Sequence, residues 1–310
     1  HHARGEGHRV RLVGRQRAYH GVNFGGLSVS GIGRNKKVFG PGLPGVHHIS
    51  HTWLPESRFT KGQPEQGAYL ADDLERLVET FGETIAACIV EPVAGSTGVL
   101  VPPKGYLERL RKICNRHGIL LIFDEVITGF GRLGAPFAAK AFGVTPDLMT
   151  MAKGITNGCL PMGAVAVEDD IYKTITETAS AGAIEFFHGY TYSAAPVSVA
   201  AALAVQKIYR QENLFERAKK MSPMFIDALF SLKGLPVVTD IRGYGMLAGI
   251  DLDPDKQPGL RGHEAYLRLY EAGLMVKATS DVLLIAPPLI AQGSHISMIT
   301  EHLKAVLSKI

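Results

Sequence analysis

The sequence predicts an α/β protein that has a mostly parallel sheet, followed by a smaller α+β domain. Its 310 residues exceed what one compact core usually takes, so two domains are expected. Short apolar runs alternate with amphipathic stretches in the first two thirds, as in strands joined by crossover helices. After about residue 211 charged helical segments mix with strand-like ones. We therefore expect a large domain over residues 1–210 and a small domain over residues 211–310.

The elements of the large domain follow from periodicity. Apolar residues at helical spacing after an acidic start predict a helix over residues 72–81. A second amphipathic helix is expected over residues 105–117, ended by Gly118. Continuous apolar runs predict strands buried on both faces, over residues 85–90, 119–123 and 148–151.

A long Ala-rich helix is expected over residues 196–210, because Pro196 suits the first turn of a helix. In the small domain the pattern predicts two strands, a third apolar strand and a closing helix, over residues 237–241, 246–252, 282–286 and 294–310.

Composition argues against nucleic-acid and membrane proteins. The net charge is +4, and the densest basic stretch, residues 4–17, is interrupted by glycines, histidine and Glu6 rather than forming a clean stripe. Apolar runs such as residues 119–123 are far too short to span a bilayer, and no secretory signal opens the chain. We expect neither a nucleic-acid partner nor a membrane span.

The cysteines and histidines do not predict a metal site. Three widely spaced cysteines form no CxxC or CxxH pattern, which favours reduced thiols and a cytoplasmic protein. His47, His48 and His51 cluster in a region rich in glycine and proline, but no acidic ligand lies at close spacing. We therefore expect no bound metal.

Three polar side chains follow predicted parallel strands. Glu91 follows the strand ending at residue 90, Asp124 the strand ending at residue 123, and Lys153 the strand ending at residue 151. Ligands of such sheets bind at the carboxyl ends of strands. A pyridoxal phosphate (PLP) site needs an amine that bonds the aldehyde and a carboxylate that keeps the pyridine nitrogen protonated. Spacing alone also allows the ordinary alternatives, a helix-capping aspartate and a solvated lysine.

Two long motifs extend this argument. Residues 123–132 read FDEVITGFGR and residues 146–158 read PDLMTMAKGITNG. Both resemble the signatures of class III aminotransferases, and the 29-residue separation of Asp124 and Lys153 fits that family. The resemblance covers essentially the whole chain and is greatest to ω-amino acid–pyruvate transaminases, the β-alanine enzyme included. It implies the PLP-dependent transferase fold type I.

The resemblance also implies residue roles and an assembly. Lys153 would be the Schiff-base lysine and proton shuttle, and Asp124 the partner of the pyridine nitrogen. The other implied cofactor-binding residues are Val126 on one ring face, Tyr19 near the other, His20, and Thr191 on the phosphate of a neighbouring subunit. Glu91 and Tyr19 are implied on the substrate side. A homodimer or tetramer with shared active sites is implied.

Most of these roles have a structural alternative. Val126 suits the core as well as a cofactor ring, and Tyr19 suits a half-buried aromatic position. Thr191 is also an ordinary strand residue, and Glu91 could only cap a loop. Glu125 is expected to be structural rather than catalytic.

The substrate expectation rests on the strand before the Ala-Pro-Pro motif. Relatives that use 2-oxoglutarate carry an arginine there, and Leu284 stands at that place in this chain. Pyruvate is therefore the expected acceptor, and alanine its product, in a ping-pong transamination of an ω-amino acid or primary amine. Lys277 is the candidate for binding the substrate carboxylate, although it lacks the bidentate fork of arginine and equally suits an exposed strand end.

Two features depart from the family pattern. Ala194 stands where the family has a glycine, and so loses the freedom to adopt positive φ. The chain also opens without the Gly-Ser loop that binds the cofactor phosphate in the family, as in a partial sequence or a truncated protein with weak PLP affinity. Another PLP chemistry on this scaffold (aminomutase, decarboxylase or racemase) and a non-catalytic module remain the rival interpretations.

Overall fold

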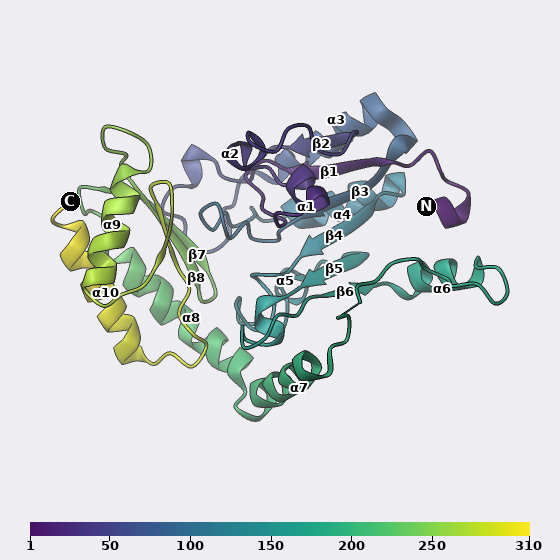
Figure 1. Ribbon diagram of the computed structural model, residues 1–310. Helices are drawn as coiled ribbons and strands as arrows, with labels where there is room; N and C mark the ends of the chain where they lie inside the picture. Colours follow the sequence, from purple (N-terminus) through teal and green to yellow (C-terminus); the bar gives the residue numbers. More distant parts are fainter.

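The computed structural model describes residues 1–310 and contains two sheets (Figure 1). The larger sheet has the strand order β2-β1-β3-β4-β5-β6, and all of its neighbouring strands are parallel except β5 and β6. Its strands are β1 Arg11–Arg15, β2 Val46–Ile49, β3 Ile85–Val90, β4 Leu120–Asp124, β5 Leu148–Met151 and β6 Ala164–Val167. The prediction of an α/β fold with a mostly parallel sheet is confirmed.

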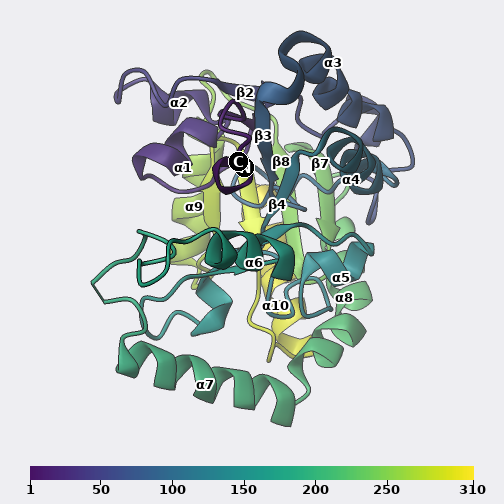
Figure 2. The ribbon, with the colours of Figure 1, turned by 90° about the vertical axis from the view of Figure 1, so that its right-hand side faces the viewer.

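Seven helices belong to this part of the chain: α1 Phe24–Val29, α2 Gly33–Lys36, α3 Asp72–Phe81, α4 Tyr106–His117, α5 Ala138–Phe142, α6 Asp169–Glu177 and α7 Pro196–Gln211. Short 3₁₀ turns span His2–Arg4, Pro55–Ser57, Ala68–Ala71, Gly82–Thr84 and Lys153–Ile155. The stop at Gly118 is as expected, because this glycine adopts φ 62° and its N–H donates to the Cys114 carbonyl. Helix α7 lies along the lower edge of the molecule in both views (Figures 1 and 2).

Sequence periodicity located the central strands but not the outer ones. Strands β3 and β5 and helix α3 have the predicted bounds, whereas β4 starts one residue later than expected and includes Asp124. Strand β1 was missed because it reads RLVGR, in which arginines replace the apolar residues of a buried strand. Strand β6 was missed because it is an exposed antiparallel edge strand.

The second sheet is antiparallel, with the order β7-β8-β10-β9. Its strands are β7 Val238–Tyr244, β8 Leu247–Leu252, β9 Lys277–Thr279 and β10 Val282–Ile285. Helices α8 Leu214–Phe230, α9 Leu260–Glu271 and α10 Gly293–Leu307 accompany it. This arrangement agrees with the α+β structure expected for the C-terminal third.

Each sheet has its own hydrophobic core. One cluster joins β3, β4 and α4, and the other joins α8, α10 and the antiparallel sheet. Leu247 and Leu284 of the second sheet nevertheless belong to the first cluster, so the two parts are packed together at that point. The division into domains at residues 210 and 211 stays a prediction. No helix combines the length and apolar composition that crossing a bilayer requires.

Candidate active site

Lys153 stands directly after β5, in the 3₁₀ turn Lys153–Ile155. Its backbone has φ 42°, a left-handed conformation that disfavours residues with a Cβ atom and that tends to occur at functional sites. The next residue, Gly154, is in close contact with Phe130 and Tyr209. A Cβ atom on Gly154 would lie 2.7 Å from Cβ of Phe130, and the Gly154 carbonyl accepts a 2.8 Å hydrogen bond from the Tyr209 hydroxyl. These contacts fix the backbone that carries Lys153.

Asp124 is the last residue of β4, and its neighbour across the parallel pair is Thr150 of β5. The carboxylate is buried and accepts two hydrogen bonds: Oδ1 from the Val126 N–H at 3.0 Å and Oδ2 from Nδ1 of His20 at 2.8 Å. The His20 side chain is 2% exposed, and its Nε2 is buried without a partner. The carboxylate is therefore held in one orientation by the Val126 N–H and by Nδ1 of His20, whereas Nε2 of the same ring has no protein partner.

Glu91 is the first residue after strand β3. Its carboxylate accepts hydrogen bonds from the Tyr19 N–H at 2.9 Å and from the Gly95 N–H at 3.0 Å. Burial raises the pKa of Glu91, an effect opposed by His20 and by the hydrogen bond from Tyr19. Arg15 donates to the Glu91 carbonyl at 2.6 Å, so the backbone at the end of β3 is also anchored.

Charged groups from other segments of the chain surround the Lys153 amine. Burial lowers the pKa of Lys153, and the positive charge of Lys277 lowers it further. The carboxylates of Asp124 and Glu91 act in the opposite direction and raise it. Because such effects fall off with distance, three separate segments contribute charged groups to the surroundings of one amine.

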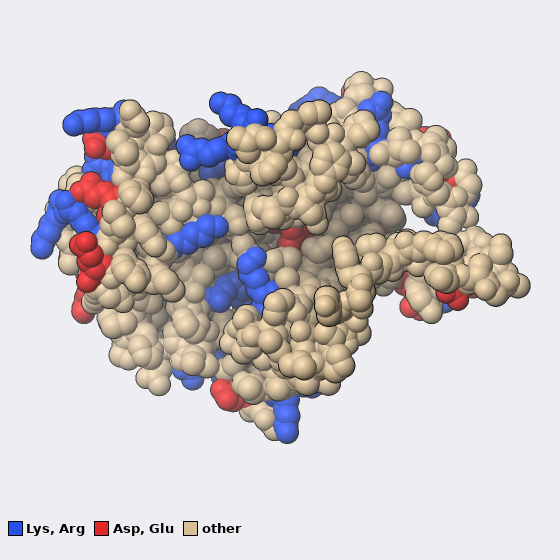
Figure 3. Space-filling model, in the orientation of Figure 1, with Lys and Arg blue, Asp and Glu red and all other residues tan.

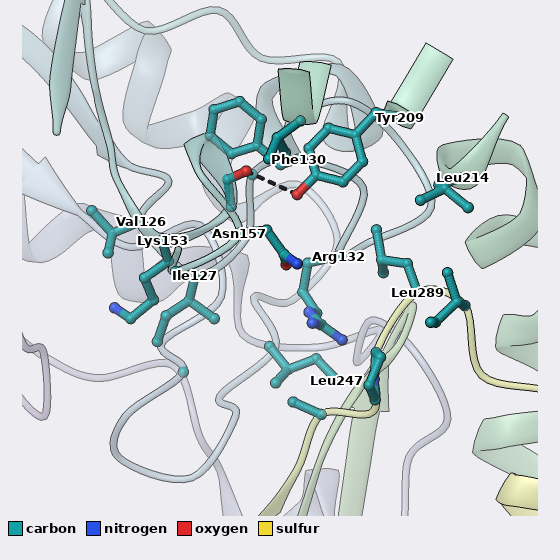
Figure 4. A pocket seen from close by; sticks show the side chains of 18 of the residues that line it. Val126, Ile127, Phe130, Arg132, Lys153, Asn157, Tyr209, Leu214, Leu247 and Leu289 are labelled. Carbon is teal, nitrogen blue, oxygen red and sulfur yellow. Dashed lines mark hydrogen bonds between the residues drawn. The ribbon is translucent and has the colours of Figure 1, made fainter. Parts of the chain in front are cut away.

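Lys153 borders a cavity of about 940 Å³. Lys153, Val126 and Lys277 line it, as does Leu284, the residue that stands in place of the family's arginine. Figure 4 shows Lys153 beside Val126 and Ile127, with Arg132 and Asn157 further into the cavity. In the space-filling view, Lys and Arg side chains border the hollow between the two parts (Figure 3).

Comparison with known proteins assigns the family. Residues 1–307 match the family described as Aminotransferase class-III. The chain belongs to the class-III aminotransferases. It is 53% identical to an omega-aminotransferase of Caulobacter vibrioides, over all of this chain and 71% of that protein. It is 44% identical to an omega-amino acid–pyruvate aminotransferase of Pseudomonas putida, over 99% of this chain and 69% of that protein.

The solved structures agree. The omega transaminase of Pseudomonas jessenii in complex with PMP superposes with a TM-score of 0.92 at 32% identity, covering 99% of this chain and 69% of that one. A transaminase with L-ala gives a TM-score of 0.90 at 33% identity and covers 99% of this chain and 74% of that one. The aminotransferase family and fold predicted from the motifs are thus confirmed.

Among the predicted site residues of this aminotransferase, three line the cavity: Lys153, Val126 and Lys277. Four others lie outside its lining: Asp124, His20, Tyr19 and Glu91. Thr191 lies in an exposed turn before α7 and does not line the cavity around Lys153. Its role on a neighbouring subunit stays a prediction. Sequence reasoning missed Arg132 and Tyr209, which do line the cavity. Arg132 is the last residue of the first motif, whereas nothing in the sequence distinguishes Tyr209 from other aromatic residues of a helix.

Glu125, next to Asp124, has the structural role expected for it. It is fully buried, and its carboxylate accepts hydrogen bonds from the Thr128 hydroxyl at 2.5 Å and from the N–H groups of Ala138 and Ala139 at 2.8 Å each. It thereby anchors the loop after β4 to the start of α5.

The turn before α7 provides a first prediction. The expectation that an alanine here gives up positive φ is wrong: Ala194 adopts φ 58°, the conformation for which glycine is best suited. Ala194→Gly should therefore raise the free energy of unfolding by about 1 kcal/mol, measured by urea denaturation. Ala195→Gly is the matched control: Ala195 has φ −48°, so glycine there relieves no strain and should destabilise through its extra chain entropy. Destabilisation by both substitutions would contradict the prediction.

Proposed function

We propose that this aminotransferase binds PLP covalently at Lys153 and transfers the amino group of an ω-amino acid or primary amine to pyruvate. The observation that carries the proposal is the placement of Lys153 and Asp124 at the ends of the adjacent strands β5 and β4. The carboxylates of Asp124 and Glu91 both raise the pKa of the Lys153 amine. The PMP complex of the Pseudomonas jessenii relative supports a cofactor of this class.

The residues around Asp124 fit the cofactor. A buried carboxylate next to the cavity suits a protonated pyridine nitrogen, and the hydrogen bond from His20 would keep that carboxylate in place. Val126 lines the cavity where an apolar side chain can contact one face of an aromatic ring, and Tyr19 would lie near the other face. Bound PLP supplies an electron-accepting ring that stabilises negative charge on the substrate carbon.

The protein's own side chains would then move the protons. The Nζ atom of Lys153 would remove a proton from the amino-bearing carbon of the donor and return a proton during the transfer. The lowered pKa of Lys153 increases the fraction of neutral amine available for this step. Asp124 would hold the proton on the ring nitrogen, and the apolar residues of the cavity would limit the access of water. The two half-reactions share this one amine, as a ping-pong cycle requires.

The proposal of pyruvate as the amino acceptor rests on the part of the cavity wall that strands β9 and β10 form. Leu284 on β10 is paired with Lys277 on β9, and both line the cavity. A leucine at this place offers no second cation for the longer dicarboxylate 2-oxoglutarate, whereas Lys277 can bind one carboxylate. Glu91 would border the substrate side. The names of the Pseudomonas putida relative and of a beta-alanine–pyruvate aminotransferase of Pseudomonas aeruginosa, 45% identical, support the same acceptor.

A second copy of the chain is the proposed partner. The segment before α7 exposes large apolar side chains, among them Phe187 at 85% and Tyr192 at 89% exposure. Exposed apolar surface of this extent is typical of protein contacts. Burial against a second copy would also place Thr191 where it could bind the partner's cofactor phosphate. A homodimer or tetramer would sediment as such at micromolar concentration.

An absorbance titration with PLP, followed by borohydride reduction and peptide mapping, tests the site. We expect a new visible band and a modified peptide that contains Lys153. Modification of another lysine would overturn the site assignment. Production of alanine from pyruvate and β-alanine, with little product from 2-oxoglutarate, tests the reaction and separates it from aminomutase, decarboxylase and racemase chemistry.

The pH dependence of cofactor capture gives a second prediction. Only the neutral amine bonds the aldehyde, so the capture rate should rise with pH, with a midpoint below the ordinary lysine value of 10.5. Lys277 lowers the pKa of Lys153, so Lys277→Met should move the midpoint to higher pH. Lys207→Met on α7, whose charge does not act on Lys153, is the control. An unchanged or lowered midpoint in Lys277→Met would contradict this electrostatic account.

A further inference from the structure

Arg132 joins the two parts of the molecule. It lies in the loop between β4 and α5, and its Nη1 donates to the carbonyl of Met246 at 3.0 Å and to that of Pro287 at 2.6 Å. The Met246 N–H donates in return to the Arg132 carbonyl at 2.9 Å. One residue of the loop after Asp124 thus holds two separate segments of the small, antiparallel part.

The turn that contains Met246 is closely packed against the backbone next to Arg132. Gly245, in the turn between β7 and β8, has φ 64°, and a Cβ atom there would lie 2.4 Å from Cα of Leu133 and 2.7 Å from the Arg132 carbonyl oxygen. The β7–β8 turn is therefore seated directly on the backbone of residues 132 and 133. A shift of this turn would have to move the loop that carries Val126.

Both hydrogen-bonded segments form the cavity wall on the side of the small sheet. Leu247 follows Met246, and Ala286 and Pro288 flank Pro287; all three line the cavity around Lys153. Figure 4 shows the Arg132 side chain extending toward Leu247, away from Lys153. Lys277 and Leu284, the proposed substrate-binding wall, belong to the same sheet.

The Arg132 side chain has no ion-pair partner. No carboxylate lies within salt-bridge distance of it, and burial lowers its pKa. Its side-chain hydrogen bonds go to backbone carbonyls, so they fix the position of the backbone and neutralise no charge. Both bonds leave from Nη1, whose two N–H directions are fixed by the planar guanidinium, whereas the donors of a lysine ammonium rotate and define no such directions.

We propose that Arg132 is a positioning residue for transamination, because it sets where the substrate-binding wall of the small sheet stands relative to Lys153. This inference rests on the proposed function of the cavity. Arg132 acts through the backbone of Met246 and Pro287 and is not assigned a contact with the reacting atoms.

The chain contains a closely matched control. Arg217 on α8 also donates to two backbone carbonyls, those of Ile290 at 2.9 Å and Ala291 at 3.0 Å, but from within the small part. Arg217→Lys therefore makes the same chemical change next to the loop that contains Pro287. It leaves the hydrogen bond between Arg132 and Pro287 intact, so this loop stays attached to the loop after Asp124. A general loss of stability should appear in both variants, whereas a shift of the wall should follow from Arg132→Lys.

The test compares the two variants with the parent protein. For Arg132→Lys we expect KM for the amino donor to rise about tenfold, with kcat changed less than about threefold and the Lys153 cofactor band retained. Arg217→Lys should leave KM within about twofold. An equal change of KM in both variants, or a lowered melting temperature of Arg132→Lys with unchanged KM, would overturn the inference.

Gly245→Ala disturbs the same contact between the β7–β8 turn and residues 132 and 133, but from the side of the turn. If it folds, the added Cβ should push the turn away from Leu133 and raise KM as Arg132→Lys does. An unchanged KM in folded Gly245→Ala would count against the inference. Failure of the proposed function itself would look different, since the parent protein would then lack the cofactor band or the donor-dependent formation of alanine.

Discussion

Replacing Lys153 by alanine is expected to lower the rate of transamination by about 10⁴-fold or more. The substitution removes the amine that would hold the cofactor and the base that would move the proton, and general acid–base catalysis alone contributes about 10²–10⁴-fold. Formation of alanine from pyruvate and β-alanine, measured with saturating PLP, gives the rate. Circular dichroism should show an unchanged fold, because the Lys153 side chain lines the cavity and belongs to none of the hydrophobic cores.

Two controls separate chemistry from structure in this experiment. Lys140→Ala removes another lysine, in α5, that does not line the cavity around Lys153, and should leave the rate within about twofold. Addition of a small primary amine such as methylamine should restore part of the activity of Lys153→Ala, because a free base can then enter the cavity. Near-parental activity of Lys153→Ala without added amine would remove the basis of the proposed mechanism.

The neighbourhood of Lys153 could be predicted because it depends on local rules. Continuous apolar runs identify strands buried on both faces, and parallel strands end at the same edge of a sheet. Asp124 and Lys153 follow adjacent strands of this kind. The order of strands needed no long-range information here, since β3, β4 and β5 are neighbours in sequence as well as in the sheet.

Other parts of the site depend on contacts between distant segments, which periodicity does not reveal. His20 bonds Asp124 although 104 residues separate them, and Arg132 bonds Pro287 although 155 residues separate them. Arg132 ends the first motif and His20 is a site residue that the family resemblance implies, but neither observation predicts the hydrogen-bond partner. Strand β1 was overlooked for a related reason: Arg15 is 1% exposed in a position where burial of an arginine depends on a carbonyl supplied by Glu91.

Asp124→Asn is expected to lower kcat by about 10³-fold while the protein stays folded. The carboxylate would face the protonated ring nitrogen, and a pair of opposite charges about 4 Å apart is worth about 4 kcal/mol at an effective dielectric constant of about 20, which corresponds to about three orders of magnitude in rate. Asparagine keeps the size, its oxygen can accept from the Val126 N–H, and its amide group can donate to Nδ1 of His20 in the other tautomer, so both hydrogen bonds survive. It carries no charge to hold the proton on the ring.

The adjacent carboxylate supplies the control for this prediction. Glu125 is buried as Asp124 is, but its partners are Thr128 and the start of α5, whereas Asp124 accepts from His20 and from Val126, which lines the cavity. Glu125→Gln exchanges one of the acceptor oxygens for an amide group, so it should lower the free energy of unfolding by about 1–3 kcal/mol and leave kcat of the folded protein within a few-fold. Asp124→Asn should show the opposite pattern, a small change in stability with a large loss of kcat. If both substitutions reduce stability and kcat in the same proportion, Asp124 acts through the fold, and its assignment to the ring nitrogen is wrong.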